Sequence, residues 1–420
     1  MDWNFLIKSN TDFLCVTTDS RNITPGCVFF ALKGERFNGN LFATQAIEKG
    51  AAYAIVDEEI PATCLQKREY KGQIVRVDNS LLALQDLART WRQHLNKPVI
   101  GITGTNGKTT TKELLAAVLS RKYNVHYTQG NLNNAIGVPL TLLQLRREHE
   151  LAIVEMGASH PGDINELVEI ACPNYGLITN VGEAHLEGFG SPEGVKQTKK
   201  ELYDYLCQHN GTVFLNEDNP SLRQMLEDAK QQFASCSLSV VGYRRGVLPE
   251  GVQLVGGYNA ENVSAAICVG GYFGVSHEEA LEAVRSYKPS NNRSQAMQTK
   301  KNRLVVDAYN ANPTSMQAAI ESFTTITDDK TPAAYILGAM RELGVHSKLA
   351  HQNIVNMLAE RKAEEVILVG KEWRDTTAPY IIYDDTQSLY DALQKEPLEG
   401  KHILLKGSHS VGLEKLLEVL

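Results

Sequence analysis

A glycine-rich turn between a short apolar strand and a helix constrains this chain more than any other feature. The run GITGTNGKTT spans residues 101–110 and follows the apolar residues Val99 and Ile100. Its glycines let backbone N–H groups converge on phosphate oxygens, and the helix N-terminus adds its positive end. Lys108 is placed to reach the β- and γ-phosphates, and Thr109 to ligate Mg²⁺. The turn departs from GxxxxGK[ST] because Ile102 occupies the first glycine position. It predicts phosphate binding by Gly104, Thr105, Asn106, Gly107, Lys108, Thr109 and Thr110.

Strand-like apolar runs alternate with helical sequence on both sides of this turn, which predicts parallel sheets covered by helices. Such runs occupy 27–32 and 74–77, then 152–156, 175–180 and 211–216, then 303–307, 334–338, 365–370 and 402–407. A linker signal lies at 288–292. We expect an α/β protein of three domains: a small α/β domain over 1–97, a P-loop domain with a parallel sheet over 98–289, and a Rossmann-like domain over 290–420.

Composition excludes several classes of function. The 420 residues carry 42 Lys and Arg against 49 Asp and Glu, a net charge of −7, so a general nucleic-acid binder is not expected. No apolar run reaches the roughly 20 residues that cross a bilayer, and the first residues lack a signal peptide's apolar core. The 7 cysteines are scattered without a CxxC pair, which argues against both a disulfide framework and a zinc site. We expect a cytoplasmic protein with no membrane insertion.

Polar residues that follow the predicted strands are candidates for metal chemistry. Glu155 ends an apolar run, where it could complete a P-loop Mg²⁺ site. His185 follows the next strand and could be a metal ligand or a capping side chain. Lys196, Lys199 and Lys200 follow on a probable helix, and from the pattern alone they are a solvated charged face.

Several longer strings resemble the Mur ligase family, the ATP-dependent amide-forming enzymes of peptidoglycan precursor synthesis. The resemblance covers essentially the whole chain. Short P-loops are shared by all Mur ligases and by folylpolyglutamate synthases, whereas the strings at 131–143, 185–191 and 309–316 are more particular to one branch. The strings that carry the resemblance are TDSR (18–21), FALKGERFNG (30–39), GTNGKTTTKE (104–113), GNLNNAIGVPLTLL (130–143), EMGASHPGDI (155–164), AHLEGFGSPEGV (184–195), DAYNANPTSM (307–316) and KGSHS (406–410).

The resemblance implies an amide ligase that joins D-alanyl-D-alanine to UDP-MurNAc-tripeptide through an acyl phosphate. It implies ATP and Mg²⁺, with Lys108, His185 and Lys199 catalytic and with Thr109, Glu155, His185 and Lys199 around the metals. In this family a lysine is carbamylated by CO₂, and the match of GVKQTKKELY (194–203) points to Lys199. Lys200 or Lys196 is the alternative, because Lys200 stands where relatives often have Gly. A monomer is expected.

Further residues are assigned to binding by the resemblance alone. The adenine and C-terminal side of the ATP site would comprise Asn259, Asn262, Arg293, Asp307 and Tyr309. The UDP-linked substrate would contact Ser20, Arg21, Lys33, Gly34, Arg36, Phe37, Asn133, Asn134, Asn310 and Asn312. Three positions depart from the family pattern, so their roles stay open: Asn40, Tyr258 and His409.

Three other functions compete with this interpretation. The first is another amide ligase on the same fold, either the one that adds a diamino acid or a folylpolyglutamate synthase. The diamino-acid ligase would carry a DNPR-type motif, and DAYNANP stands here instead. The second is a P-loop ATPase or kinase acting as a switch, which would not need the His185 and Lys199 pair. The third is a catalytically inactive binder of UDP-sugars, which would not need to keep Lys108, Thr109 and Glu155.

Overall fold

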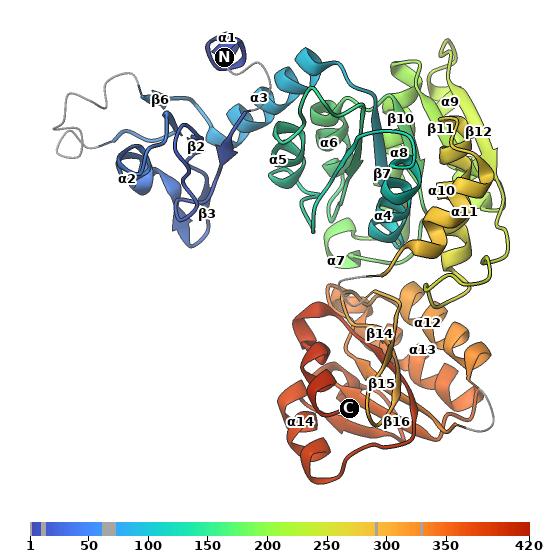
Figure 1. Cartoon of the computed structure of the whole chain (residues 1–420). Helices are drawn as coiled ribbons and strands as arrows, with labels where there is room; N and C mark the ends of the chain where they lie inside the picture. Colours follow the sequence, from blue (N-terminus) through green and yellow to red (C-terminus); the bar gives the residue numbers. More distant parts are fainter. Residues whose placement is uncertain (1, 10–13, 61–72, 290–292, 328–330) are drawn as a thin grey trace.

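Three β-sheets, each flanked by helices, follow one another along the chain in the computed structural model (Figure 1). The structure describes residues 2–9, 14–60, 73–289, 293–327 and 331–420. The linker signal at 288–292 falls partly outside these ranges. These three sheets are parallel except for one edge strand of the third, and a further two-stranded sheet in the first domain is antiparallel, so the predicted α/β class with three domains is confirmed.

The N-terminal sheet is small and lies apart from the rest of the molecule (Figure 1). Its order is β1-β2-β5-β6, all parallel, and α2 covers one face while α1 and α3 contribute buried residues to the other. Short strands suit this domain because few apolar residues are available to bury. The elements are α1 (Asn4–Ser9), β1 (Val16–Thr17), β2 (Val28–Phe30), the antiparallel pair β3 (Lys33–Gly34) and β4 (Phe37–Asn38), α2 (Ala43–Glu48), β5 (Tyr53–Val56), β6 (Ile74–Arg76) and α3 (Ser80–Leu95).

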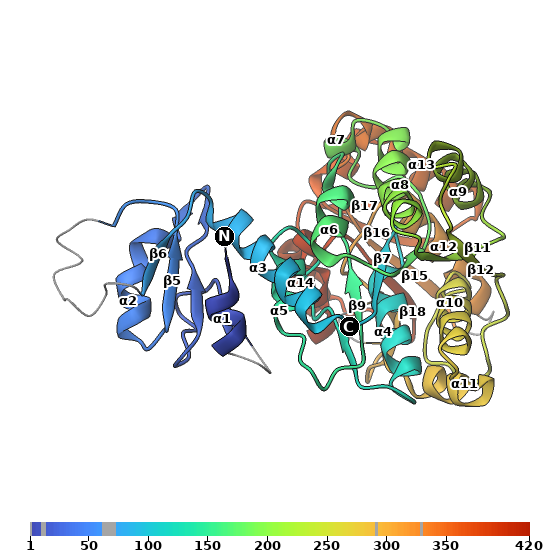
Figure 2. The ribbon, with the colours of Figure 1, turned by 90° about the horizontal axis from the view of Figure 1, so that it is seen from above.

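Helix α3 joins the N-terminal sheet to the central domain, as the view from above shows (Figure 2). Asn79 caps its start by accepting a hydrogen bond from the Leu82 N–H, and Asn96 ends it in a left-handed conformation. Trp91 is fully buried, and its indole N–H donates to the Leu145 carbonyl at 2.9 Å. The helix therefore belongs to one apolar core that runs from the first sheet into the second.

The central sheet has six parallel strands in the order β12-β11-β10-β7-β9-β8. Helices α3, α5, α6, α8 and α9 lie on one face, and α4, α10 and α11 on the other. Two edge strands, β8 and β12, were not predicted, because both are half exposed and lack a continuous apolar run. The strands are β7 (Val99–Thr103), β8 (Val125–Tyr127), β9 (Leu151–Glu155), β10 (Tyr175–Ile178), β11 (Thr212–Asn216) and β12 (Ser239–Tyr243). The helices are α4 (Lys108–Leu119), α5 (Gly137–Leu143), α6 (Asp163–Ala171), α7 (Leu186–Phe189), α8 (Pro192–Gln208), α9 (Pro220–Gln232), α10 (Asn259–Tyr272) and α11 (His277–Ser286).

The C-terminal sheet has the order β13-β14-β18-β15-β16-β17, with β13 antiparallel to β14 and the others parallel. Helices α12 and α13 cover one face, and α14 with the last turns of the chain covers the other. The edge strands β13 and β17 were again not predicted. The elements are β13 (Gln295–Gln298), β14 (Arg303–Asp307), α12 (Pro313–Ile326), β15 (Ala333–Gly338), α13 (Ser347–Glu360), β16 (Glu365–Val369), β17 (Ile381–Tyr383), α14 (Thr386–Lys395) and β18 (His402–Lys406).

The strand order fixes where a ligand can bind. Strand β7 lies between β10 and β9, so the P-loop, Glu155 and the segment after Ile178 meet at one edge of the sheet. The C-terminal domain faces this edge (Figure 1). No helix in the part of the chain that the structure describes is long and apolar enough to cross a membrane. The six cysteines within the described ranges are free thiols, and Cys64 lies outside them.

Candidate active site

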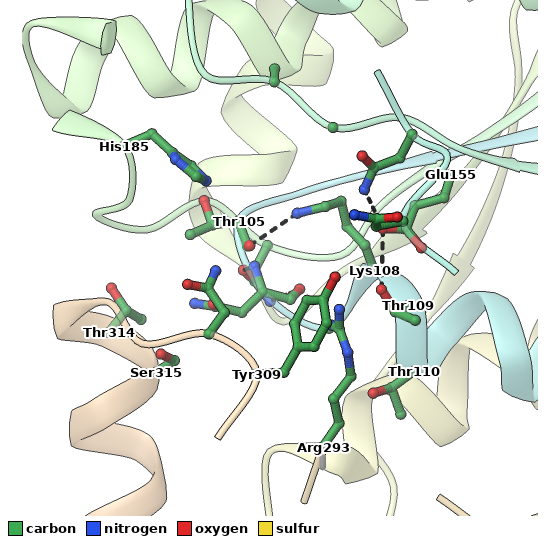
Figure 3. Close-up of a pocket in the computed structure, with 18 of the residues that line it drawn as sticks. Thr105, Lys108, Thr109, Thr110, Glu155, His185, Arg293, Tyr309, Thr314 and Ser315 are labelled. Atoms are coloured by element: carbon green, nitrogen blue, oxygen red, sulfur yellow. Dashed lines mark hydrogen bonds between the residues drawn. The ribbon is translucent and has the colours of Figure 1, made fainter. Parts of the chain in front are cut away.

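The P-loop is held in shape by two glycines and by the end of strand β10. Gly107 takes a left-handed φ of 82° at the start of α4. The Asn106 N–H donates to the Asn180 side-chain oxygen at 3.0 Å, and the Thr179 hydroxyl donates to the Asn106 carbonyl at 2.6 Å. The Lys108 ammonium donates to the Gly104 carbonyl at 2.7 Å and to the Thr105 carbonyl at 3.2 Å, and Figure 3 draws the second of these bonds. Burial lowers the pKa of Lys108, the positive charge of Arg293 lowers it further, and the Glu155 carboxylate opposes both effects.

Gly104→Ala is expected to weaken nucleotide binding by distorting this loop. Gly104 has a φ of 144°, which L-residues rarely adopt, and an added Cβ would lie 2.0 Å from the Thr179 hydroxyl oxygen. We expect the dissociation constant for ATP, measured by calorimetry, to rise at least about tenfold, since strain of this kind costs about 1–3 kcal/mol. Gly130→Ala is the matched control, because Gly130 also has a positive φ but has open space around it. Unchanged ATP affinity in Gly104→Ala would contradict the expectation.

Glu155 at the end of β9 is almost fully buried beside the P-loop. Its Oε1 accepts hydrogen bonds from the Thr109 hydroxyl at 3.1 Å and from the Asn133 amide at 2.8 Å. Its Oε2 is buried without a hydrogen-bond partner and lies 3.7 Å from the Lys112 ammonium. A buried carboxylate oxygen beside a P-loop hydroxyl fits a Mg²⁺ ion that also binds nucleotide phosphates. No cluster of three His, Cys, Asp or Glu side chains occurs in the described residues, so phosphate oxygens or water would complete the coordination.

His185 lies on the far side of the same cavity and faces the C-terminal domain (Figure 3). It precedes α7 with a left-handed φ of 52°, and its Nδ1 lies against the Glu342 carboxylate. Burial lowers the pKa of His185, the positive charges of Lys108 and Lys199 add to this effect, and Glu342 opposes it. The Glu187 N–H also donates to the Glu342 carbonyl at 3.3 Å, so the two domains meet here.

The three candidate lysines of α8 have different surroundings. Lys199 is 2% exposed and has no ion pair within the described ranges, and its Nζ lies 5.5 Å from the centroid of the Phe189 ring. Burial lowers the pKa of Lys199 to about 7, with the charge of Lys108 acting in the same direction. Lys200 instead pairs with Asp204 at 2.5 Å and with the Gln232 side chain at 3.0 Å. Lys196 is half buried and does not line the cavity.

The C-terminal domain supplies a stack of planar side chains to the cavity. The Arg293 guanidinium lies 3.8 Å from the centroid of the Tyr309 ring, which itself stacks against His409 with ring centroids 5.7 Å apart. The Arg293 Nε is buried without a hydrogen-bond partner among the described residues. The Asp307 carboxylate accepts a hydrogen bond from the buried Lys406 ammonium at 2.7 Å. This wall brings the Arg293 cation, held against the Tyr309 ring, to the cavity that the P-loop also lines, where it can offset the charge of nucleotide phosphates.

Several asparagines near the cavity form hydrogen bonds with other side chains of the protein. The Asn262 amide donates to the Asn259 oxygen at 2.9 Å, and its own oxygen accepts from the Thr111 hydroxyl at 3.1 Å. Asn312 caps α12, and its amide also donates to the Asn106 oxygen at 2.8 Å, which connects the P-loop to the C-terminal domain. These bonds place α10 and α12 against the P-loop. The Tyr258 hydroxyl, where the family pattern is not kept, is within 2.6 Å of the Ser294 hydroxyl.

The cavity has a volume of about 1050 Å³ and lies between the central and C-terminal domains. Most of the predicted residues line it. These are Thr105, Asn106, Gly107, Lys108, Thr109, Thr110, Asn133, Asn134, Glu155, His185, Asn259, Asn262, Arg293, Asp307, Tyr309 and Asn310. Gly104, Lys199 and Asn312 do not line it. Gly104 precedes Thr105 in the P-loop, Asn312 is hydrogen-bonded to Asn106, and Lys199 is close enough to His185 for its charge to lower the pKa of His185.

The predicted N-terminal binding residues are not part of this cavity. Ser20 is buried, the Arg21 guanidinium and backbone N–H donate three hydrogen bonds to the Asp19 carboxylate, and Lys33 pairs with Glu58. Phe37 is half exposed and stacks on Phe42. Gly34 and Arg36 are exposed nearby. Asn40 is buried, and its amide donates to Asp57 at 2.8 Å, which gives it a role within the domain. These residues all belong to the N-terminal domain, so a ligand that contacts both them and the cavity must span two domains.

Many residues around the cavity were not predicted, and three of them are charged side chains that lie beside predicted ones or beside each other. Lys112 approaches Glu155, Glu342 pairs with His185, and Arg341 lines the cavity beside Glu342. Lys112 could have been suspected, because it stands one helical turn after Lys108. Glu342 and Arg341 come from a loop far along the chain, and nothing local in their sequence marks them.

A P-loop, a buried carboxylate and a cavity closed by a second α/β domain define an ATP-dependent enzyme of the P-loop class. Family models match three parts of the chain: "Mur ligase family, catalytic domain" at 13–92, "Mur ligase middle domain" at 102–244 and "Mur ligase, glutamate ligase domain" at 292–409. The UDP-N-acetylmuramoyl-tripeptide–D-alanyl-D-alanine ligase of Bacillus subtilis is 33% identical over 96% of this chain and 92% of its own. The chain belongs to the Mur ligase family.

Solved structures agree with this assignment. MurF from Acinetobacter baumannii superposes with a TM-score of 0.84 at 28% identity, covering 98% of this chain and 97% of its own. MurF ligase from Thermotoga maritima, solved in complex with ADP, superposes with a TM-score of 0.83 at 28% identity, covering 97% of this chain and 96% of its own. The similarity extends through all three domains.

Proposed function

We propose that this chain joins D-alanyl-D-alanine to UDP-MurNAc-tripeptide with hydrolysis of ATP to ADP and phosphate. The observation that carries the proposal is the shared cavity, in which the P-loop and Glu155 face His185 and a C-terminal wall of Arg293 and Tyr309. Its volume of about 1050 Å³ exceeds what a nucleotide alone would fill. The relatives that match over almost the whole chain carry the same activity in their names.

The chemistry begins with an unfavourable encounter between two anions. The carboxylate of the tripeptide attacks the γ-phosphorus of ATP, a new C–O–P linkage forms, and the bond to the β-phosphate oxygen breaks to release ADP. Lys108 and Arg293 are the cations positioned to offset the charge of the transferring phosphoryl group. The amine of D-alanyl-D-alanine then attacks the acyl carbon, loses a proton and displaces phosphate. Water must be kept out because acyl phosphates hydrolyse readily.

Mg²⁺ and a carbamate are part of this proposal. Thr109 and Glu155 would hold one Mg²⁺ and His185 a second, and the ions would neutralise phosphate charge. Lys199 would carry the carbamate: its neutral amine adds to CO₂, an N–C bond forms and one proton leaves. Its burial and lowered pKa support this choice, and the ion pair of Lys200 with Asp204 disfavours the neighbour. Lys199 lies behind the cavity surface, and its approach to a metal is an inference from the family.

The remaining substrate contacts follow from the length of the substrate. The N-terminal domain would bind the UDP end, because Arg21, Lys33 and Arg36 are exposed cations and Phe37 is an exposed aromatic ring, with Ser20 buried beside Arg21 in the chain. The peptide would extend from there to the cavity, where Asn133 and Asn134 line the central-domain side. We further infer that the chain acts in the cytoplasm, since ATP and UDP-linked precursors are both cytoplasmic metabolites. We also expect it to act as a monomer.

The test is phosphate release from ATP by the purified chain with three substrate sets. We expect turnover that requires UDP-MurNAc-tripeptide and D-alanyl-D-alanine together. Turnover only with UDP-MurNAc-dipeptide and a diamino acid would assign the chain to the preceding ligation step. Turnover only with a folate and glutamate would assign it to folylpolyglutamate synthesis, and no amine-dependent turnover would favour a non-catalytic role.

A further inference from the structure

Two carboxylates organise the segment 159–165, which comprises the end of the β9–α6 connection and the first turn of α6. The Asp163 Oδ2 accepts hydrogen bonds from the N–H groups of Ser159 and His160, both at 2.8 Å. The Glu201 carboxylate accepts the Gly162 N–H at 3.0 Å through one oxygen and the Asn165 N–H at 2.7 Å through the other. The two acidic groups therefore use four backbone donors within seven residues.

Glu201 supplies a cap that helix α6 lacks locally. Gly162, the residue before α6, has a left-handed φ of 87° and no side chain with which to cap the first turn. Glu201 belongs to α8, the helix that also carries Lys199, and α8 packs against α6. The cap therefore fixes the start of α6 relative to the helix of the predicted carbamylated lysine.

The segment held by Glu201 is a wall of the cavity. Ser159, His160 and Asp163 line it. The segment also packs tightly against α7, the helix preceded by His185, because a Cβ at Gly188 would lie 2.1 Å from the Ser159 carbonyl oxygen. A shift of this wall would therefore disturb the surroundings of His185 as well as the cavity.

Helix α6, into which this segment leads, lies on the same face of the central sheet as α3 and on the opposite face from α10. Helix α3, which leads to the N-terminal domain, packs against α5 and α6 (Figure 2). Its Gln85 amide donates to the Ala135 carbonyl at 3.1 Å and to the Glu166 carboxylate at 2.6 Å, and both of these residues line the cavity. A peptide substrate that extends from the N-terminal domain would meet this wall.

We propose that Glu201 is a positioning residue for the peptide substrate, which it serves by holding the segment 159–165 between α7 and α8. The inference rests on the proposed ligase function and goes further, since it separates recognition of the peptide from recognition of ATP. Glu201 itself touches neither substrate. It acts through the hydrogen bonds that it accepts from the backbone N–H groups of Gly162 and Asn165.

The test compares Glu201→Gln with Asp204→Asn. A glutamine has one side-chain oxygen, which can replace only one of the two carboxylate oxygens. Its NH₂ group would then face the second backbone N–H, which loses its acceptor. Asp204 lies on the same helix and pairs with Lys200 at 2.5 Å, so its substitution makes the same change of charge away from the wall. In Glu201→Gln we expect the KM for UDP-MurNAc-tripeptide to rise about tenfold, as the loss of a charge-assisted hydrogen bond implies, with the KM for ATP unchanged. Asp204→Asn should leave both constants unchanged.

Amide hydrogen exchange measures the same contact without any substrate. The Gly162 and Asn165 amides should exchange about tenfold faster in Glu201→Gln than in the parent or in Asp204→Asn. Unchanged exchange at both amides, or an equal rise in KM for ATP and for the peptide substrate, would overturn the proposal. Glu201→Asp retains the charge on a shorter side chain and serves if Glu201→Gln fails to fold; it should show the same selective rise in KM. If the parent itself does not turn over the tripeptide, the ligase function fails, while exchange still decides whether Glu201 holds the wall.

Discussion

Lys108→Ala is expected to reduce ATP-dependent phosphate release by about 1,000-fold. The Lys108 ammonium is the cation within the P-loop itself, and it lies among the residues that line the cavity. In a buried site, one preorganised donor aimed at developing charge contributes about 100- to 1,000-fold to the rate, and a full positive charge belongs at the upper end of that range. Steady-state phosphate release with the complete substrate set measures the loss.

Lys122→Ala is the matched control for this prediction. Lys122 follows the C-terminal end of the same helix, where its ammonium donates to the carbonyls of Phe273 and Gly274 at 3.2 Å, far from the P-loop. It should retain nearly full activity. The thermal midpoint of Lys108→Ala should stay close to that of the parent, because the substitution removes a buried charge. Activity within tenfold of the parent would mean that Lys108 does not stabilise the transferring phosphoryl group.

The part of the site that is local in sequence could be predicted without a structure. The P-loop needs a strand, a glycine-rich turn and a helix in succession, and β7 and α4 supply them at the predicted residues. Glu155 could be predicted for a similar reason, because the end of a buried strand beside the P-loop strand is where a parallel sheet places ligands. The central strands were found because they are continuous apolar runs.

The part that depends on tertiary contacts could not be predicted. Glu342 meets His185 because the third domain approaches α7, and Glu201 caps a helix whose start lies almost 40 residues earlier. A single sequence holds no local pattern for such pairs. The edge strands β8 and β12 were missed for a different physical reason. Each pairs with a neighbouring strand along one edge only and is partly exposed to solvent, so its sequence need not be apolar throughout.

The choice among the lysines of α8 shows what burial adds to a sequence pattern. From the charge pattern alone, Lys196, Lys199 and Lys200 are equivalent charges on one helix, and only the family resemblance points to Lys199. In the structure Lys200 is neutralised by Asp204, while Lys199 is buried without such a partner within the described ranges. A buried ammonium without a counter-ion is unfavourable, so the neutral amine is favoured at Lys199. Only the neutral amine can add to CO₂, which makes Lys199 chemically distinct from its neighbours.

Lys199→Ala is therefore expected to lower turnover by at least about 100-fold, the scale on which loss of one charged group in a buried site acts. Bicarbonate should stimulate the parent depleted of CO₂ but not this variant. With ¹³C-labelled bicarbonate, the parent should show a carbamate carbon signal in NMR spectra that Lys199→Ala lacks.

Lys200→Ala is the matched control: it removes the adjacent charge, whose partner Asp204 lies away from the cavity, and it should keep both the signal and most of the activity. A carbamate signal that persists in Lys199→Ala and disappears in Lys200→Ala would move the modification to the neighbouring lysine, and no signal in the parent would remove the carbamate from the mechanism.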